Sequence, residues 1–412
     1  MNIKRLAGTG NPFIIGTDIP NEYFCDREME TAKLIGYITN GNNVVLKAQR
    51  RLGKTSLLMH LFKQPEIGGR YNTLMVDIYM TKGESDFIRE FSKAFLNAPF
   101  TKTEKGKNAL NELFPEVRLY ANLNLGVFNA GAEAKLRTEY AVTLDKMFAF
   151  LEQTDKPNLV VFDEFQTIEE YPEKMSAILR SYVQKMTNTR FVFSGSERHL
   201  LASMFNESNK PFFRTALPME LDIIPEATYQ AFCSRLFEQR KRHITSEAIS
   251  FTYDLFTANT YEMQQVMNLA FSFTGEGKTA GIPVIKDCIQ GYLLDNDAYY
   301  RKLLAQSKSV KERNLLQCLA VESTASELTS QAMISKYNLG GPSSVTSSLK
   351  KLTNMKRATV SEIGSGHFRL QDKFFELWLC DAIGILEQKY EMAADTFRKE
   401  REALRSLPGR FA

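Results

Sequence analysis

Gly53, Lys54 and Thr55 have the residue types and the order that close a phosphate-binding loop. In such a loop a glycine lets the backbone pass close to the phosphates, a lysine binds the β- and γ-phosphates, and a hydroxyl binds Mg²⁺. The common pattern has another glycine five positions earlier, where this chain carries Ala48. We expect alanine to serve there, because it ends an apolar stretch where φ need not be positive. The loop predicted to contact a nucleotide comprises Ala48, Gln49, Arg50, Arg51, Leu52, Gly53, Lys54, Thr55 and Ser56.

Two adjacent acids follow a second apolar stretch, "LVVFDE", which ends at Asp163 and Glu164. Ligands of parallel sheets lie at the carboxyl ends of the strands, so these acids are expected beside the loop. Strand alternation should turn them in different directions. Asp163 suits a Mg²⁺ site, directly or through water, and Glu164 suits the group that polarises an attacking water. The pair favours hydrolysis of ATP over transfer of a phosphate to a small molecule, although an acidic loop start is the simpler alternative.

Two further positions are candidates for contact with the γ-phosphate. "FVFSGS" ends a third apolar stretch, so Ser194 or Ser196 could touch the phosphate or the water, or the turn could simply need Gly195. Arg214 follows a polar segment and could stabilise charge on the γ-phosphate. A surface ion pair is the alternative for Arg214, and the sequence leaves open whether it acts in its own chain or in another.

Apolar stretches alternate with amphipathic ones over the first half of the chain, as expected for a parallel sheet with helical crossovers. This pattern predicts a P-loop domain over residues 1–220 with an α/β fold. Residues 100–140 interrupt the alternation and are predicted to form a hairpin insertion. The predicted strands are 43–48, 71–80, 158–165 and 189–196, and the predicted helices include 55–64, 84–97, 140–153 and 175–186.

Residues 221–304 contain successive helical patterns without strands, so they are predicted to form an all-α lid domain. Residues 305–380 read as three helices and a two-stranded wing, which is a winged helix-turn-helix domain. Residues 381–412 are predicted to be one long polar helix, most simply a solvated packing element. On the third winged-helix helix, small hydroxyls and lysines are candidates for DNA contact, although such domains also bind proteins. The candidates are Ser344, Ser347, Ser348, Lys350 and Lys351.

The composition restricts the class of protein. The net charge is only +4, so any nucleic-acid contact must come from a local patch. The five cysteines and four histidines are scattered without a metal-binding spacing, and the cysteines fit a reducing compartment. Neither a signal peptide nor an apolar run of membrane-spanning length is recognised. We therefore expect a cytoplasmic protein with no membrane partner.

Several motifs together resemble the archaeal-type P-loop ATPase family, close to the signal-transduction ATPases with numerous domains (STAND) and to AAA+ initiator-type ATPases. They are "FCDREME", "RRLGKTSLL", "VVFDEFQ", "FSGSERHLLASMF", "PFFRTALPMELDIIP" and "HFRLQDKFFELWL". The resemblance implies binding of ATP or ADP with Mg²⁺ and places Phe24 and Arg27 near the adenine. It also makes Arg214 the family's candidate arginine. The Gly-x-Pro of the family's lid is absent at Asn259–Glu262.

Two functions remain open from the sequence. The first is an ATP-hydrolysing molecular switch, slow or stimulated by a partner, with ATP between sheet domain and lid and a winged helix that transmits the change. The second is a DNA-binding regulator or mobile-element-associated protein that uses ATP as a conformational ligand with little turnover. The candidate partners are duplex DNA, a protein client and a second copy of the chain.

Overall fold

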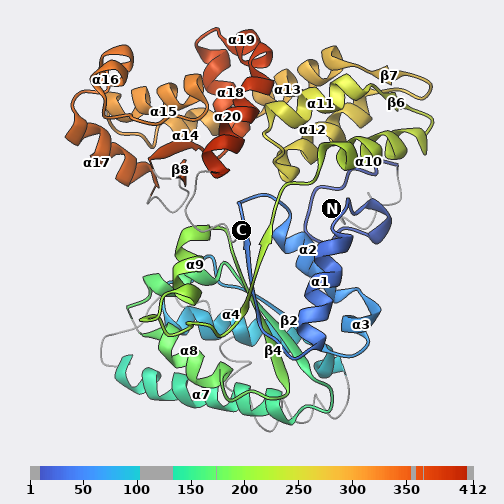
Figure 1. Cartoon of the computed structure of the whole chain (residues 1–412), viewed down its shortest axis with the longest axis vertical. Coiled ribbons are helices and arrows are strands. Elements are labelled where there is room, and N and C mark those ends of the chain that lie inside the picture. Colours follow the sequence, from blue (N-terminus) through green and yellow to red (C-terminus); the bar gives the residue numbers. More distant parts are fainter. Residues whose placement is uncertain (1–9, 103–132, 173, 354–358, 365, 406–412) are drawn as a thin grey trace. The chain divides into compact units, whose positions relative to one another are not determined.

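A computed structural model of the chain describes residues 10–102, 133–172, 174–353, 359–364 and 366–405 (Figure 1). The chain divides into two compact units. One comprises Gly16–Asp222, and the other comprises the residues up to Ile15 together with those from Ile223 onward. The predicted domain over residues 1–220 therefore starts too early, because residues 10–15 pack in the second unit. Phe13, which is fully buried, contacts the rings of Phe232, Phe237 and Phe271 there.

A five-stranded parallel sheet forms the centre of the first unit, in the order β2-β3-β4-β1-β5. Four of its strands were predicted, and two of them, β1 and β3, are buried along their whole length on both faces. The edge strand β5 was missed, since exposed Leu217 and Pro218 break its apolar pattern. The strands are β1 (Val44–Ala48), β2 (Asn72–Asp77), β3 (Asn158–Asp163), β4 (Thr189–Gly195) and β5 (Leu217–Leu221).

Helices cover both faces of this sheet, and each face has its own apolar core (Figure 1). One face is covered by α1 (Glu28–Thr39), α2 (Lys54–Phe62) and α3 (Pro65–Gly68). The other is covered by α4 (Glu84–Asn97), α7 (Glu133–Gln153), α8 (Met175–Val183) and α9 (Arg198–Asn206). Helix α7 begins at Glu133, so residues 133–140 are helical rather than part of the predicted hairpin. Residues 103–132 of that predicted insertion lie outside the described part of the chain.

The second unit begins with four helices, as predicted for residues 221–304. They are α10 (Glu226–Glu238), α11 (Ser246–Leu255), α12 (Thr260–Phe273) and α13 (Ile282–Asp295). Although no strand was predicted in this region, the segment between α12 and α13 contains a short one, β7 (Thr279–Ala280), which pairs with β6 (His243–Ile244). Asn259, in the segment without Gly-x-Pro, caps α12 through a hydrogen bond from the Glu262 N–H. Glu262 in turn accepts a hydrogen bond of 3.0 Å from the Lys373 N–H, so this segment joins the helical region to the C-terminal region.

The C-terminal part contains the predicted winged helix. Its elements are α14 (Asp297–Leu304), α15 (Val310–Glu322), α16 (Gln331–Tyr337), α17 (Pro342–Thr353), the antiparallel wing β8 (Val360–Gly364) and β9 (His367–Leu370), and α18 (Lys373–Ala382). Helix α14, predicted as part of the lid, packs on α18, since the Trp378 indole donates a hydrogen bond to Asp297 and Phe375 stacks on Tyr300.

The prediction that the tail is one long helix is wrong. After Gly384, whose φ is +76°, the chain forms two helices, α19 (Leu386–Glu391) and α20 (Ala393–Arg405). Both bury apolar side chains, including Leu386 and Tyr390, and α20 packs on α11 through an edge-to-face contact between Phe397 and Tyr253. The tail packs more deeply than a solvated helix would, because charged residues of these helices, Lys389 and Glu400, are themselves buried.

A buried ionic network explains how those charges are tolerated. Glu376, only 1% exposed, accepts hydrogen bonds from Lys373 (2.8 Å) and Ser323 (2.9 Å), and the Lys389 ammonium lies 3.2 Å away. Arg369 of the wing pairs with Glu400 of α20. Burial opposes ionisation of Glu376, but the two ammonium groups outweigh it and lower its pKa. The network thus ties α18, α19, α20 and the wing together.

Replacing this carboxylate should destabilise the protein. We expect Glu376→Gln to lower the free energy of unfolding by about 2 to 3 kcal/mol at neutral pH, because two buried ammonium groups lose their counter-ion. Since the folded-state pKa is lowered, this contribution is present above the ordinary glutamate pKa and is lost as the pH falls through the folded value. Urea denaturation at several pH values measures it, with exposed Glu327→Gln as control. An equal loss of stability at neutral and strongly acidic pH would contradict this account.

Candidate functional site

The loop between β1 and α2 has the geometry of a phosphate cradle. Arg51 and Gly53 both have positive φ, at +67° and +84°, and Ala48 ends β1 without one, as expected from the sequence. A Cβ on Gly53 would meet no atom within 4 Å, so open space lies over the loop. The first N–H groups of α2, which follow Gly53 without a side-chain cap, can bind an anion there.

Lys54 joins this loop to the acidic end of β3. Its ammonium lies 2.9 Å from Asp163 Oδ1 and 2.9 Å from Glu164 Oε1. Burial opposes its protonation, but the two carboxylates outweigh burial and raise its pKa. The prediction that the two acids point in different directions is wrong, because Glu164 adopts a left-handed conformation, with φ +56°, that ends the strand alternation. Three residues from two distant segments therefore meet at one point.

Asp163 is the centre of a second set of hydrogen bonds. It accepts from the hydroxyls of Thr55 (2.7 Å) and Ser194 (2.6 Å). Burial alone would raise the pKa of Asp163, but the Lys54 ammonium and the two hydroxyls have the larger combined effect. The net result is a lowered pKa, which favours the ionised carboxylate. Ser194 thus orients Asp163 in this structure rather than a water. The described residues contain no cluster of three or more metal-binding side chains. The Thr55 hydroxyl and the Asp163 carboxylate suit Mg²⁺, because bound Mg²⁺ usually keeps several waters and takes its other ligands from substrate phosphates, so that it needs few protein ligands.

Glu164 is held by residues that the sequence analysis only partly identified. Its Oε2 accepts hydrogen bonds from the amide of Gln166 (2.7 Å) and from the hydroxyl and N–H of Ser196 (2.8 and 3.1 Å). Burial raises the pKa of Glu164, but Lys54 and these donors outweigh it and lower the pKa. Ser196 was an alternative to Ser194 in the sequence. Gln166 was missed as a site residue, although its position two residues after Glu164 could have indicated it.

Of the two residues expected near the adenine, Arg27 contacts the loop and Phe24 contacts α2. Arg27, which is 4% exposed, donates to Glu30 (2.7 Å) and to the Leu52 carbonyl (3.5 Å). Phe24 stacks on His60 of α2, with ring centroids 4.1 Å apart and planes 2° from parallel. Arg50, in contrast, bonds the Tyr79 hydroxyl (3.1 Å) and lies over its ring, so its side chain contacts the segment after β2.

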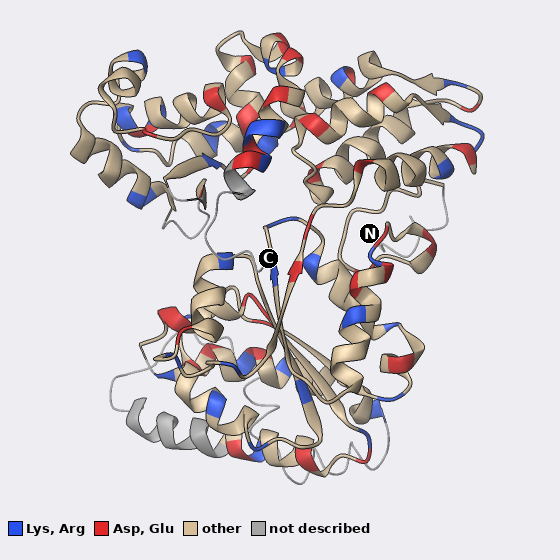
Figure 2. Cartoon of the chain, in the orientation of Figure 1, with Lys and Arg blue, Asp and Glu red and all other residues tan. Residues whose placement is uncertain are grey.

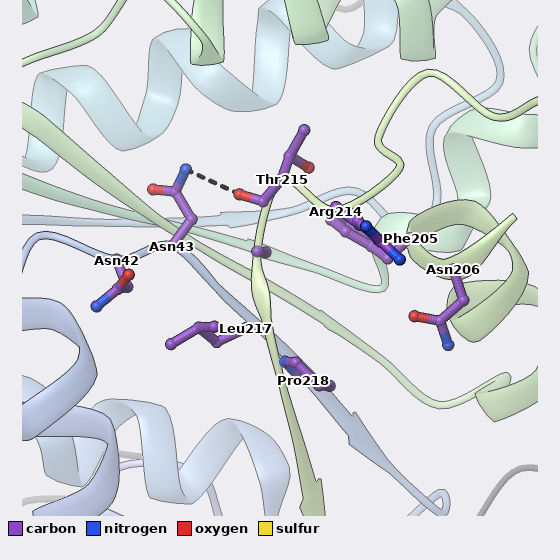
Figure 3. A pocket seen from close by; sticks show the side chains of 9 residues that line it. Asn42, Asn43, Phe205, Asn206, Arg214, Thr215, Leu217 and Pro218 are labelled. Carbon is purple, nitrogen blue, oxygen red and sulfur yellow. Dashed lines mark hydrogen bonds between the residues drawn. The ribbon is translucent and has the colours of Figure 1, made fainter. Parts of the chain in front are cut away.

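Arg214 does not join this site in its own chain, contrary to one of the two roles left open for it. It precedes β5, beside Asn43 at the start of β1, whereas the loop follows the other end of β1. At about 3.3 Å per residue, the two ends of β1 are roughly 15 Å apart. Arg214 is exposed and lines a cavity of about 290 Å³ with Asn42, Asn43, Asn206 and Leu217 (Figure 3). Arg214 therefore lies at the end of β1 opposite the Lys54 cradle.

The structure narrows the set of DNA-contact candidates on α17. Ser348 is 6% exposed and is removed from the set. Lys351 is paired with Glu312 at 3.1 Å, so part of its charge is compensated. Ser344 is half-buried, and Ser347 and Lys350 are exposed. Basic and acidic residues are interspersed over the described helices of this unit (Figure 2).

Comparisons with known proteins support the fold. Residues 298–381 match the family model described as a probable winged helix domain. A Walker-type ATPase of Pyrococcus abyssi is 16% identical, with a TM-score of 0.60 over 89% of this chain and 99% of that one. The ORC2 protein of Aeropyrum pernix, solved in ADPNP–ADP complexes, is 13% identical, with a TM-score of 0.55 over 96% and 99%. No curated protein sequence matches the chain.

A third solved structure, the ORC1 protein of Aeropyrum pernix in complex with DNA, is 10% identical, with a TM-score of 0.50 over 89% of this chain and 94% of that one. At these identities the likeness establishes the fold. The chain has the fold of the P-loop AAA+ ATPases, followed by a helical region and a winged helix, and the predicted fold class is confirmed. Among the described residues, no helix is long and apolar enough to cross a membrane.

Proposed function

We propose that this protein binds ATP with Mg²⁺ at the Lys54 loop and hydrolyses it slowly. The observation that carries the proposal is the meeting of Lys54 with Asp163 and Glu164, each at 2.9 Å, beside an open loop of P-loop geometry. The N–H groups of the loop and Lys54 would hold the phosphates, while Thr55 and Asp163 would hold Mg²⁺. Bound Mg²⁺ would supply charge neutralisation at the β- and γ-phosphates.

Glu164 is the residue proposed to polarise the attacking water. In the structure its carboxylate receives hydrogen bonds from Lys54, Gln166 and Ser196, which leaves little capacity for a water. We infer that Lys54 must move from the carboxylates to the phosphates before Glu164 can act, and this supports a low basal rate. Calorimetric titration with ATP and Mg²⁺, followed by a phosphate-release assay, tests the proposal. Absence of ATP binding by the wild-type protein would contradict it.

Arg214 is proposed to act on the nucleotide of a second copy of the chain. Two observations support this role. Arg214 is exposed, and it lies beside the start of β1, whereas the Lys54 loop of the same chain follows the other end of that strand. We expect Arg214→Ala to leave ATP affinity and the rate of dilute protein unchanged. It should lower the additional rate of concentrated protein about 10-fold, as expected for one charge-assisted hydrogen bond in the transition state. Turnover as a function of protein concentration measures this effect.

A mixture of two variants separates action between copies from action within one. Arg214→Ala protein retains Glu164, and Glu164→Gln protein retains Arg214. If the arginine acts across copies, mixing them should restore part of the activity that neither has alone. An additive rate in the mixture would contradict the proposal, as would a loss of activity in dilute Arg214→Ala protein.

The nucleotide state is further proposed to be transmitted to the winged helix. The helical region and the winged helix form one compact unit, and the bond from the Lys373 N–H to Glu262 joins them directly. Any change imposed on the helical region would therefore reach the winged helix through packed residues. Duplex DNA stays a predicted partner, for which Ser347 and Lys350 offer exposed groups on α17.

A further inference from the structure

The two oxygens of the Glu164 carboxylate are held by different donors. Within the described part of the chain, Oε1 accepts a hydrogen bond only from the Lys54 ammonium, at 2.9 Å. Oε2 accepts three, from the Gln166 amide (2.7 Å) and from the hydroxyl (2.8 Å) and N–H (3.1 Å) of Ser196. Neither donor residue to Oε2 belongs to the phosphate-binding loop. Movement of Lys54 to the phosphates of a nucleotide would therefore free Oε1 and leave Oε2 anchored.

The orientation of the Gln166 side chain is set by this carboxylate. Gln166 is 5% exposed and lies on the short helical turn Phe165–Glu170 that follows Glu164. Its amide nitrogen must face Oε2 of Glu164, because an ionised carboxylate can only accept hydrogen bonds. The amide oxygen of Gln166 is then buried without a hydrogen-bond partner among the described residues. Buried polar atoms are nearly always paired, so the hydrogen bond to the charged group outweighs this loss.

Gly195, at the end of β4, leaves the space that the Gln166 amide occupies. A Cβ on Gly195 would overlap the amide oxygen of Gln166 and lie 3.1 Å from its Cδ. The φ of Gly195 is not positive, so glycine is needed here for space rather than for backbone conformation. Any larger residue at this position would push the amide away from the Glu164 carboxylate.

We propose that Gln166 and Ser196 fix Glu164 through Oε2, so that Oε1 becomes the oxygen that accepts the proton of the attacking water. The inference rests on the proposed hydrolysis of ATP and assigns its reacting oxygen. Once Lys54 has moved, Oε1 takes the water proton and the water oxygen bonds to the γ-phosphorus. The bond from that phosphorus to the β–γ bridging oxygen breaks, which releases ADP and phosphate, and the proton passes from Glu164 to solvent. Gln166 touches no reacting atom, so it is a positioning residue.

Gln166→Leu should lower kcat about 10-fold, because the carboxylate loses one of the charge-assisted hydrogen bonds that orient it. ATP affinity should stay within about twofold of wild type, because an interaction that serves only the chemical step lowers kcat without weakening binding. Gly195→Ala should have the same two effects, since its methyl group displaces the amide. Single-turnover phosphate release and calorimetric titration with ATP and Mg²⁺ measure the rate and the affinity.

Matched controls exist for both substitutions. Gln153→Leu replaces an exposed glutamine at the end of α7, and Gly36→Ala adds a Cβ that would meet no atom within 4 Å. Both control proteins should have wild-type turnover and affinity. Circular dichroism and the thermal midpoint show whether each variant is folded.

Two double variants distinguish positioning from a structural role. In a Glu164→Gln background the proton acceptor is already lost, so Gln166→Leu should cause no further loss of rate. In a Gln166→Ala background the methyl group of Gly195→Ala has no amide to displace, so this substitution should also cause no further loss. Additive losses in either pair would overturn the inference.

Wild-type kcat in folded Gln166→Leu protein would overturn the inference as well. If Gln166→Leu does not fold, Gly195→Ala decides by the same criteria, and wild-type kcat in that protein would overturn it. In each of these cases the proposed binding and hydrolysis of ATP would stand. Absence of ATP hydrolysis by the wild-type protein would instead remove both proposals.

Discussion

Lys54→Ala is expected to weaken the binding of ATP by about 100-fold or more. The Lys54 side chain is 7% exposed, and its ammonium lies 2.9 Å from each of the carboxylates of Asp163 and Glu164 at the end of β3. Removing it would delete charge-assisted hydrogen bonds to the phosphates, which are worth about 1.5 to 3 kcal/mol each, and every 1.4 kcal/mol is tenfold in affinity. It would also leave Asp163 and Glu164 without their cation, so that both carboxylates would repel the phosphates. Titration calorimetry with Mg²⁺ and ATP measures the loss.

The control for this variant is Lys33→Ala, which removes an exposed lysine from α1 in the same unit. It should bind ATP within about twofold of wild type, because an exposed charge outside the site is screened by solvent. Since Lys54 is buried between two carboxylates, circular dichroism and the thermal midpoint must show that Lys54→Ala is folded. A folded Lys54→Ala protein with wild-type ATP affinity would exclude the loop as the nucleotide site.

Glu164→Gln is expected to lower turnover about 1,000-fold while ATP remains bound. Glutamine has nearly the same shape and can still accept from Ser196 and Gln166, the donors to Oε2. It cannot accept a proton from the attacking water, and general-base catalysis contributes about 10² to 10⁴ in rate. Loss of one negative charge beside the phosphates should leave affinity equal or slightly tighter. Single-turnover phosphate release, with ATP affinity measured in parallel, separates the two effects.

Glu170→Gln is the matched control for this variant. Glu170 is exposed on the short helical turn that follows Glu164, six residues farther along the chain. Its substitution should leave both turnover and affinity close to wild type. Turnover of Glu164→Gln within a few-fold of wild type would assign the water to another group. A parallel loss of ATP affinity and rate would indicate that Glu164 binds substrate rather than acting in the chemical step.

Much of the fold could be predicted because the strands and helices of the sheet unit have strong local signals. β1, β3 and β4 are continuous apolar runs, and helices with apolar stripes separate them. β5 lacks that signal because only Met219 and Leu221 of its five residues are buried. The position of Phe13 could not be predicted either, since its partners Phe232, Phe237 and Phe271 are more than 200 residues away along the chain.

The candidate site could be predicted in part for the same physical reason. Lys54, Asp163 and Glu164 follow strands of one parallel sheet, and the carboxyl ends of such strands meet at one edge. The left-handed turn at Glu164, which brings both carboxylates to Lys54, depends on the segment that follows and has no clear local signal. Arg214 precedes β5 rather than following a strand, so it lies at the end of the strands opposite the Lys54 loop. This position could have been inferred only if β5 had been recognised in the sequence. Ser348 was misassigned because the packing of α17 buries a small polar residue.

The most direct test of the central claim is a crystal structure of the protein with Mg²⁺ and a non-hydrolysable ATP analogue. The account predicts density for the phosphates over Gly53, with the Lys54 ammonium moved from Asp163 and Glu164 to the phosphate oxygens. It also predicts Mg²⁺ beside the Thr55 hydroxyl. An analogue bound elsewhere in the chain, or an unoccupied loop with Lys54 still paired to both carboxylates at saturating analogue, would contradict it.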